Sequence, residues 1–212
     1  MLNNTLKFFG LAISALAVTV SSTAMAGQAQ SWNLSRDMMK GIRKNPTGIW
    51  WFMENRSGIH DPAKYIKLPN YKNPCYDTID PINKPVCWQD SQVSFPPLVE
   101  INGAGSYRGV PLVHPGQDTP VIVRWKSPVT GIVNIAGTIS SIDPTCGDGV
   151  GWSIENGADI IRSGILPNGE GAAFFATDIS ITAGASLYFI VNMNGSTYCD
   201  SSAWDLIITS QQ

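Results

Sequence analysis

The chain has 212 residues, of which only 14% are charged, and its formal net charge is −2. It has no run of Lys and Arg, so it lacks the clustered positive charge that binding along a nucleic-acid backbone requires. Low charge combined with 20 Gly, 14 Pro and 7 Trp is more typical of an extracellular all-β protein than of a cytosolic enzyme.

The first 26 residues have the layout of a secretory signal peptide. Lys7 precedes a run of small and aliphatic residues, and Ala24–Ala26 form an A-x-A cleavage site. The apolar run is short for a bilayer span, and no basic stop-transfer cluster follows it. We therefore expect residues 1–26 to be removed and the remainder to be secreted, into the periplasm or the medium, without a membrane span.

Residues 27–95 are irregular in pattern and rich in turn signals. One helical turn is predicted around Ser35–Lys40, and the turn signal NPTG, from Asn45, leads directly into the apolar IWWFM. Four prolines and two cysteines between Leu68 and Asp90 indicate a stapled loop. We expect a loop-rich part that packs on the rest of the chain, so that residues 27–212 form one domain.

Residues 96–212 show the two-residue period of β-strands. Val121, Val123 and Trp125 share one face of a predicted strand, and Arg124 and Lys126 share the other. Each such run is short and ends at Gly, Pro, Asn or Asp roughly every ten residues, which predicts an all-β, antiparallel, jelly-roll-like sandwich. The same alternation groups Val133, Ile135 and Ile139, and it sets Val150, Trp152 and Ile154 opposite Ser153 and Glu155.

The chain has four cysteines, and disulfides are expected after a signal peptide. Three connectivities are open. We favour Cys75–Cys87, which closes the proline-rich loop, and Cys146–Cys199, which joins two distant loops. A zinc site is disfavoured because the sequence has no C-x2-C pair.

The loop CGDGVGWSIENG, from Cys146, fails two ligand templates. It has no Lys for a P-loop, and the residues around Asp143 do not fit an EF-hand. A looser calcium site stays open, with oxygen ligands from Asp143, Asp148 and Asp200, because the favoured disulfide would bring the last two together. The alternative is that both carboxylates cap their own turns.

Nothing in the sequence predicts an enzyme. No serine lies in a G-x-S-x-G motif, and we expect His60 to be a turn residue and His114 to be a structural residue at a strand end. The 16 acidic residues make chance carboxylate pairs unavoidable, so no glycosidase pair can be assigned. A hydrolase of unrecognised type remains an alternative.

Sugar binding commonly uses an exposed aromatic ring beside polar side chains, and three aromatic residues are candidates. Trp51 must point away from its neighbour Trp50 if the segment is extended, which would leave one of the two exposed. Trp88 and Tyr76 lie on or beside the stapled loop. These three residues are the predicted ligand platform.

Five short phrases occur in an order that resembles a family of secreted bacterial β-sandwich modules. They are Asn45–Trp50 (NPTGIW), Leu112–Gly116 (LVHPG), Val121–Gly137 (VIVRWKSPVTGIVNIAG), Gly147–Gly157 (GDGVGWSIENG) and Ile181–Val191 (ITAGASLYFIV). The resemblance implies a jelly-roll sandwich similar to carbohydrate-binding modules. It also implies a non-catalytic protein that binds carbohydrate or a cell-surface polymer. The alternative is an exported structural or adhesive protein with a protein partner.

Overall fold

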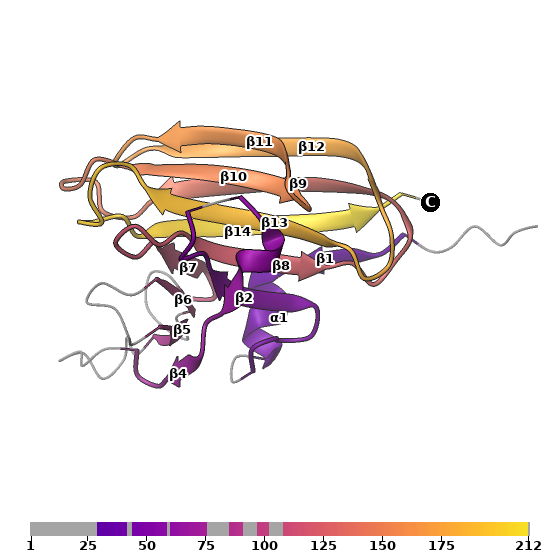
Figure 1. The fold of residues 1–212 in the computed structure, drawn as a ribbon, viewed down its shortest axis with the longest axis horizontal. Coiled ribbons are helices and arrows are strands. Elements are labelled where there is room, and N and C mark those ends of the chain that lie inside the picture. Colours follow the sequence, from indigo (N-terminus) through magenta and orange to yellow (C-terminus); the bar gives the residue numbers. More distant parts are fainter. Residues whose placement is uncertain are drawn as a thin grey trace, which may run out of the picture.

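Figure 1 shows two β-sheets packed face to face, with a helix beside them. The structure is a computed structural model that describes residues 29–41, 44–58, 60–75, 85–90, 97–101 and 108–211. The predicted leader, residues 1–26, and Tyr76 lie outside these ranges. Among the described helices, none has the length and apolar character needed to cross a membrane.

The larger sheet, sheet A, has eight strands in the order β12-β9-β14-β7-β6-β5-β4, with β1 also paired to β14. Near its start β14 pairs with β7, and near its end the same strand pairs with β1. The strands are β1 (Ser31–Asn33), β4 (Asn70–Lys72), β5 (Val86–Gln89), β6 (Leu98–Ile101), β7 (Pro111–His114), β9 (Gly131–Ser141), β12 (Gly171–Ile181) and β14 (Ser202–Ser210).

The smaller sheet, sheet B, has six strands in the order β11-β10-β13-β8-β2-β3. Its strands are β2 (Trp50–Glu54), β3 (Ile66–Lys67), β8 (Val121–Lys126), β10 (Val150–Asn156), β11 (Asp159–Leu166) and β13 (Ser186–Met193). Every pairing of these strands is antiparallel. The all-β antiparallel sandwich predicted from the sequence is confirmed.

The segment predicted to be loop-rich contributes to both sheets. Strand β2 pairs with β8 in sheet B, and β4 and β5 extend sheet A through β6. Helix α1 (Leu34–Gly41) covers the predicted helical turn, and the 3-10 helix η1 (Pro62–Lys64) lies between β2 and β3. Short strands separated by Pro and Gly therefore hold this part of the chain on the sandwich.

The main core lies between the sheets and follows the predicted alternation. Val121, Val123 and Trp125 of β8 are buried in it, whereas Lys126 is exposed. Large aromatic side chains fill the centre, where burial of each contributes roughly 1.5–3 kcal/mol. The largest fully buried side chains are Trp50, Trp125, Trp204, Phe52 and Phe189.

The outer face of sheet B is also covered, over part of its width. A second apolar cluster lies there, formed by Met53, Tyr65, Ile122, Tyr188 and Ile190. Tyr65 comes from the segment after η1, so the chain between β2 and β3 crosses this face of the sheet. As a result, the polar side chains that alternation placed on the outer face of β10, Ser153 and Glu155, are buried.

Both favoured disulfides are present. Cys75–Cys87 joins residues 12 apart in the sequence, at the start of β5, and Cys146–Cys199 joins residues 53 apart. No cysteine of the chain is free. Cys146–Cys199 links the loop between β9 and β10 to the loop between β13 and β14, and so ties the two sheets together at one end.

Candidate binding sites

A groove of about 520 Å³ lies on the outer face of sheet B, and we call it the His60 groove. Its floor is formed by strands β10, β11 and β13, and its walls are the segment after β2 and the turn before β8. Polar amide, hydroxyl, imidazole and carboxylate groups line it beside apolar side chains. The lining residues are Asn55, Gly58, His60, Asp118, Thr119, Pro120, Gly151, Trp152, Ser153, Ile160, Ser163, Gly164, Ile190, Asn192 and Met193.

A buried carboxylate organises one end of this groove. Glu155 has no exposed surface. The Ser153 hydroxyl donates to Glu155 Oε1 at 2.9 Å, and the Tyr65 hydroxyl donates to Oε2 at 3.1 Å. Nδ1 of His60 lies 2.5 Å from Oε1. Burial, together with the nearby Glu155 charge, raises the pKa of Tyr65 well above its ordinary value, so this hydroxyl stays protonated and donates.

This network fixes the orientation of His60. A carboxylate facing Nδ1 favours the form of the ring with a proton on that nitrogen, which leaves Nε2 to meet a ligand. The His60 side chain is half exposed, and it lines the groove. His60 was expected to be only a turn residue. The structure gives it a partner on β10 that its local sequence could not indicate.

The groove floor is shaped by a glycine. Gly151 of β10 is opposite Asn192 of β13. A Cβ atom at position 151 would collide with the side-chain oxygen of Asn192. The missing side chain therefore lets the exposed amide of Asn192 lie across β10, where it can donate and accept hydrogen bonds in the groove.

The predicted aromatic platform is not assembled from Trp51 and Trp88. Trp51 lies on the outer face of sheet B, where the guanidinium of Arg124 covers its ring at 5.0 Å. Trp88 is in sheet A, packs against the main core, and has its ring centre 5.2 Å from that of Tyr71. Tyr76 lies outside the described residues.

Two other aromatic side chains are well exposed in the described part of the chain. Phe175 of β12 is 65% exposed, and Tyr198, beside Cys199, is 71% exposed. Phe175 forms a cross-strand row on the outer face of sheet A with Ala136, Ile207 and Asn33, which we call the Phe175 row. A shallow groove of about 330 Å³ runs along this row. In the sequence, the adjacent pair Phe174–Phe175 indicates that one ring must face outward.

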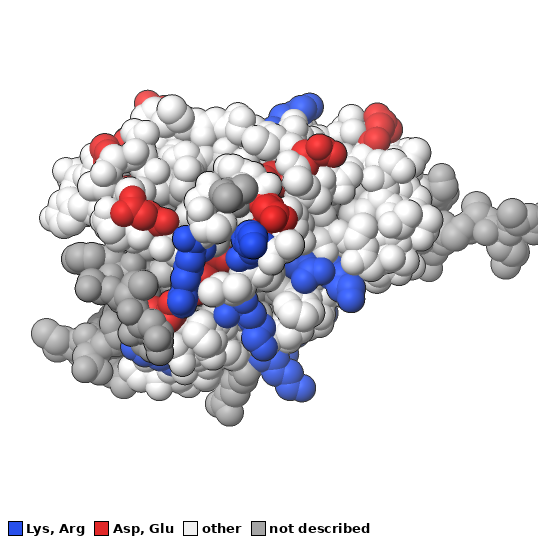
Figure 2. Space-filling view, in the orientation of Figure 1, with Lys and Arg blue, Asp and Glu red and all other residues white. Residues whose placement is uncertain are grey.

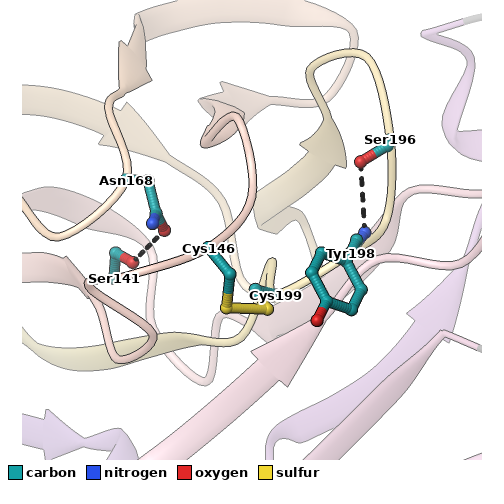
Figure 3. The surroundings of a disulfide bond; sticks show 6 residues. All are labelled: Ser141, Cys146, Asn168, Ser196, Tyr198 and Cys199. Atoms are coloured by element: carbon teal, nitrogen blue, oxygen red, sulfur yellow. Dashed lines mark hydrogen bonds between the residues drawn. A yellow bond between two sulfur atoms is a disulfide. The ribbon is translucent and has the colours of Figure 1, made fainter.

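The second disulfide anchors the GDGV loop, as Figure 3 shows. Gly147 has φ = +90°, and a Cβ there would lie 2.5 Å from the carbonyl oxygen of Tyr198. Only glycine fits a positive φ with so close an approach of two chains. The loop is thus built to bring the chain around Asp148 against the chain around Asp200.

The three acidic residues proposed for calcium lie around this disulfide and differ in their surroundings. Asp148 accepts a hydrogen bond from the backbone N–H of Ser196 at 3.4 Å, which joins the GDGV loop to the loop before β14. Asp200 is 1% exposed, and within the part of the chain that the structure describes neither of its side-chain oxygens has a hydrogen-bond partner. Burial, and then the charges of Asp148 and Asp143, raise the pKa of Asp200 to about 7.

The fit of these residues to a metal is therefore uneven. Burying the two Asp200 oxygens without hydrogen bonds costs free energy of folding, and a bound cation would offset that cost. However, no group of three or more His, Cys, Asp or Glu side chains in the described ranges is arranged to hold a metal ion. Of the three acidic residues, Asp200 is the one whose side-chain oxygens accept no hydrogen bond from the described residues and could bind a cation.

One pair of buried carboxylates lies elsewhere, at the end of β2. Arg56 pairs with Glu54 at 2.8 Å and also with Asp90, and both acids are fully buried. Burial raises the pKa of Glu54, although the Arg56 hydrogen bond opposes this shift. A glycosidase needs two carboxyl groups facing a substrate across a cleft. This pair is instead joined by a guanidinium, which suits a structural role.

Comparisons with known proteins give solved structures of low similarity and no family. No family model and no curated protein matches the chain. The K3 adhesin domain of Lys-gingipain from Porphyromonas gingivalis W83 is 8% identical, with TM-score 0.39, over 51% of this chain and 79% of that one.

Two carbohydrate-binding modules have similar values. CBM51 from Clostridium perfringens GH95, in complex with methyl-galactose, is 8% identical with TM-score 0.38, over 65% and 87% of the two chains. The CBM36-1 domain of a xylanase from the hindgut metagenome of Trinervitermes trinervoides is 8% identical with TM-score 0.35, over 77% and 98%. At such low identity, these similarities do not identify a binding residue in this chain.

Proposed function

We propose that this chain is an exported β-sandwich that binds carbohydrate in the His60 groove. The observation that carries the proposal is the convergence there of an oriented imidazole, an exposed amide and an exposed serine hydroxyl, from His60, Asn192 and Ser163. Such planar and hydroxyl groups can exchange hydrogen bonds with sugar hydroxyls. The exposed Ile160 and, at the other end of the groove, Met193 offer apolar surface to the C–H faces of a sugar.

Export is supported by two lines of argument. The first 26 residues have the pattern of a signal peptide, and the two disulfides persist in oxidising compartments. We propose a binding role without catalysis, in which the buried Glu155 serves to hold His60, Tyr65 and Ser153 in place.

The proposal is tested with a glycan array and a matched pair of variants. Asn192→Ala removes an exposed groove amide, and Thr182→Ala alters an exposed residue at the turn after β12. We expect the wild type and Thr182→Ala to bind the same glycans and Asn192→Ala to lose at least about tenfold in affinity, as for one or two hydrogen bonds. Equal binding by all three proteins would remove the groove from consideration, and sugar turnover would favour the hydrolase alternative.

We also propose that Asp200 binds a calcium ion that stabilises the loops joined by Cys146–Cys199. The support is its pair of buried oxygens without partners, beside Asp148. Asp148 and backbone carbonyls would complete the oxygen ligands. Calorimetry that detects no heat on calcium addition, with melting unchanged by EDTA, would reject the ion.

Protein binding remains a second candidate, and the Phe175 row favours it. Phe175 and Ile207 are 65% and 37% exposed on one sheet face. Exposed apolar side chains gathered on one face are typical of protein contacts. A specific protein that co-purifies with the wild type but not with Phe175→Ser, without any glycan signal, would favour this candidate over the first.

A further inference from the structure

Arg124 lies on β8, in a cross-strand row across the outer face of sheet B. Its neighbours in the row are Trp51 on β2 and Tyr188 on β13. The guanidinium carbon is 5.0 Å from the centre of the Trp51 ring and 5.9 Å from that of Tyr188. Both distances are within the range of cation–π attraction. The two rings therefore hold the charged group in place, and we call the three residues the Arg124 clamp.

The guanidinium is fixed at one edge and open at the other. Its Nε donates to the Ser186 hydroxyl at 2.8 Å. In the part of the chain that the structure describes, no hydrogen bond or ion pair engages its two terminal nitrogens. A guanidinium presents its N–H donors in a planar fork that matches the two oxygens of a carboxylate. The clamp therefore holds the Arg124 guanidinium in a position from which it can bind a carboxylate.

The charges around the clamp agree with an anionic ligand. Lys126 lies two residues further along β8 and is exposed. Figure 2 shows Lys and Arg side chains over the middle and lower part of the molecule in this view, with Asp and Glu side chains between them. Glu155 lies in the same cross-strand row as Arg124, but it is buried and engaged in its own hydrogen bonds.

We propose that the ligand of the His60 groove is an acidic glycan and that Arg124 binds one of its carboxylates. This inference rests on the proposed function. Arg124 is two strands away from Glu155, so the clamp and the end of the groove are separated by about 10 Å at the usual strand spacing. The chain segment that carries His60 and Tyr65 crosses the face between the two sites, with Tyr65 packed on Tyr188, so an extended sugar chain that meets both must pass over this segment.

The test uses acidic polymers with matched neutral forms. Binding by calorimetry is compared for polygalacturonate, alginate and hyaluronate, each beside its carboxyl-reduced form, with heparin as a sulfated polymer. Arg124→Gln removes the charge, Arg124→Lys keeps the charge but not the fork, and Lys126→Gln removes an equal charge from the same strand. Thermal melting of each variant checks that it is folded.

We expect the wild type to bind at least one uronate polymer about tenfold or more tightly than its reduced form, as for one charged hydrogen-bonded contact. Arg124→Gln should abolish this preference, Arg124→Lys should retain only part of it, and Lys126→Gln should keep most of it.

Tight binding of heparin alone would overturn the assignment to a carboxylate. Binding of neutral and acidic forms alike, lost in Asn192→Ala but not in Arg124→Gln, would overturn this inference and leave the proposed function standing. Binding of no glycan would overturn both.

Discussion

His60 and Glu155 are 95 residues apart in the sequence, yet Nδ1 of His60 lies 2.5 Å from Oε1 of Glu155. This contact, with the hydrogen bond from Tyr65, fastens the chain between β2 and β3 onto sheet B. The same contact sets one wall of the His60 groove. Stability and binding are therefore linked through Glu155.

Replacing this carboxylate should destabilise the fold. In Glu155→Ala the buried Tyr65 and Ser153 hydroxyls lose their acceptor, so we expect a loss of about 3 kcal/mol in the free energy of unfolding. Chemical denaturation measures this loss. Glu170→Ala, at an exposed position in the turn before β12, is the control and should change stability by less than about 0.5 kcal/mol. Equal effects of the two substitutions would show that the Glu155 network contributes nothing.

Gly151→Ala should separate binding from stability. The new Cβ meets only the end of the Asn192 side chain, which can turn away, so we expect a change in stability below about 1 kcal/mol. Because the amide then leaves the groove, carbohydrate affinity should fall. The control is Gly171→Ala on β12, where a Cβ meets its nearest atom at 3.5 Å. If Gly151→Ala is retained by carbohydrate in affinity electrophoresis as strongly as the wild type, and melts at the same temperature, then the Asn192 amide does not contribute to carbohydrate binding.

The stability of the calcium-free protein should depend on pH through Asp200. Its folded pKa of about 7 is above the ordinary value of 3.8, so between these values the folded state binds more protons than the unfolded state. The contribution of this group to stability is therefore fully present below about pH 4 and is lost as pH rises through 7. Denaturation at pH 4.5 and pH 8 should show this decline in the wild type but not in Asp200→Asn.

Calcium should reverse this decline. An ion on Asp200 favours the charged carboxylate, so at pH 8 calcium should raise the melting temperature of the wild type and leave Asp200→Asn unchanged. If, without calcium, the free energy of unfolding falls equally in the wild type and in Asp200→Asn between pH 4.5 and pH 8, then Asp200 does not titrate as its burial indicates.

The long-range disulfide should contribute more than the short one. In the chain-entropy model, removing Cys146–Cys199, with a separation of 53 residues, costs about 4 kcal/mol, and removing Cys75–Cys87, with a separation of 12, costs about 3 kcal/mol. Paired Cys→Ser variants, unfolded in urea, measure both. A larger loss for the short loop would indicate that local packing, rather than chain entropy, decides their contributions.

The alternation of residues in the second half of the chain was enough to predict the sandwich. Val121, Val123 and Trp125 are buried as their spacing indicates, because one side of each strand faces the core. The helix at Leu34–Gly41 and the two disulfides were also predictable. Strands β3 to β5 were not, since each has only two to four residues, too few to establish a period.

The candidate site was largely beyond the reach of the sequence. His60 stands in a turn-like GIHDP, and its partner Glu155 comes from a distant strand that only the folded topology brings near. Trp51 was singled out as a sugar platform, but Arg124 lies over its ring, a cross-strand contact that depends on register. Asp200 was named as a possible calcium ligand, and this stays a prediction, whereas its lack of hydrogen-bond partners among the described residues is a property of packing.

The central claim is that carbohydrate binds in the His60 groove, and nuclear magnetic resonance tests it most directly. The ¹⁵N-labelled protein is titrated with an oligosaccharide from a glycan that binds on the array. We predict that the largest chemical-shift changes occur at the backbone amides of Gly151, Ser153 and Ser163 and at the side-chain amide of Asn192. Shifts confined to the Phe175 row, or no shifts with any glycan, would contradict the account.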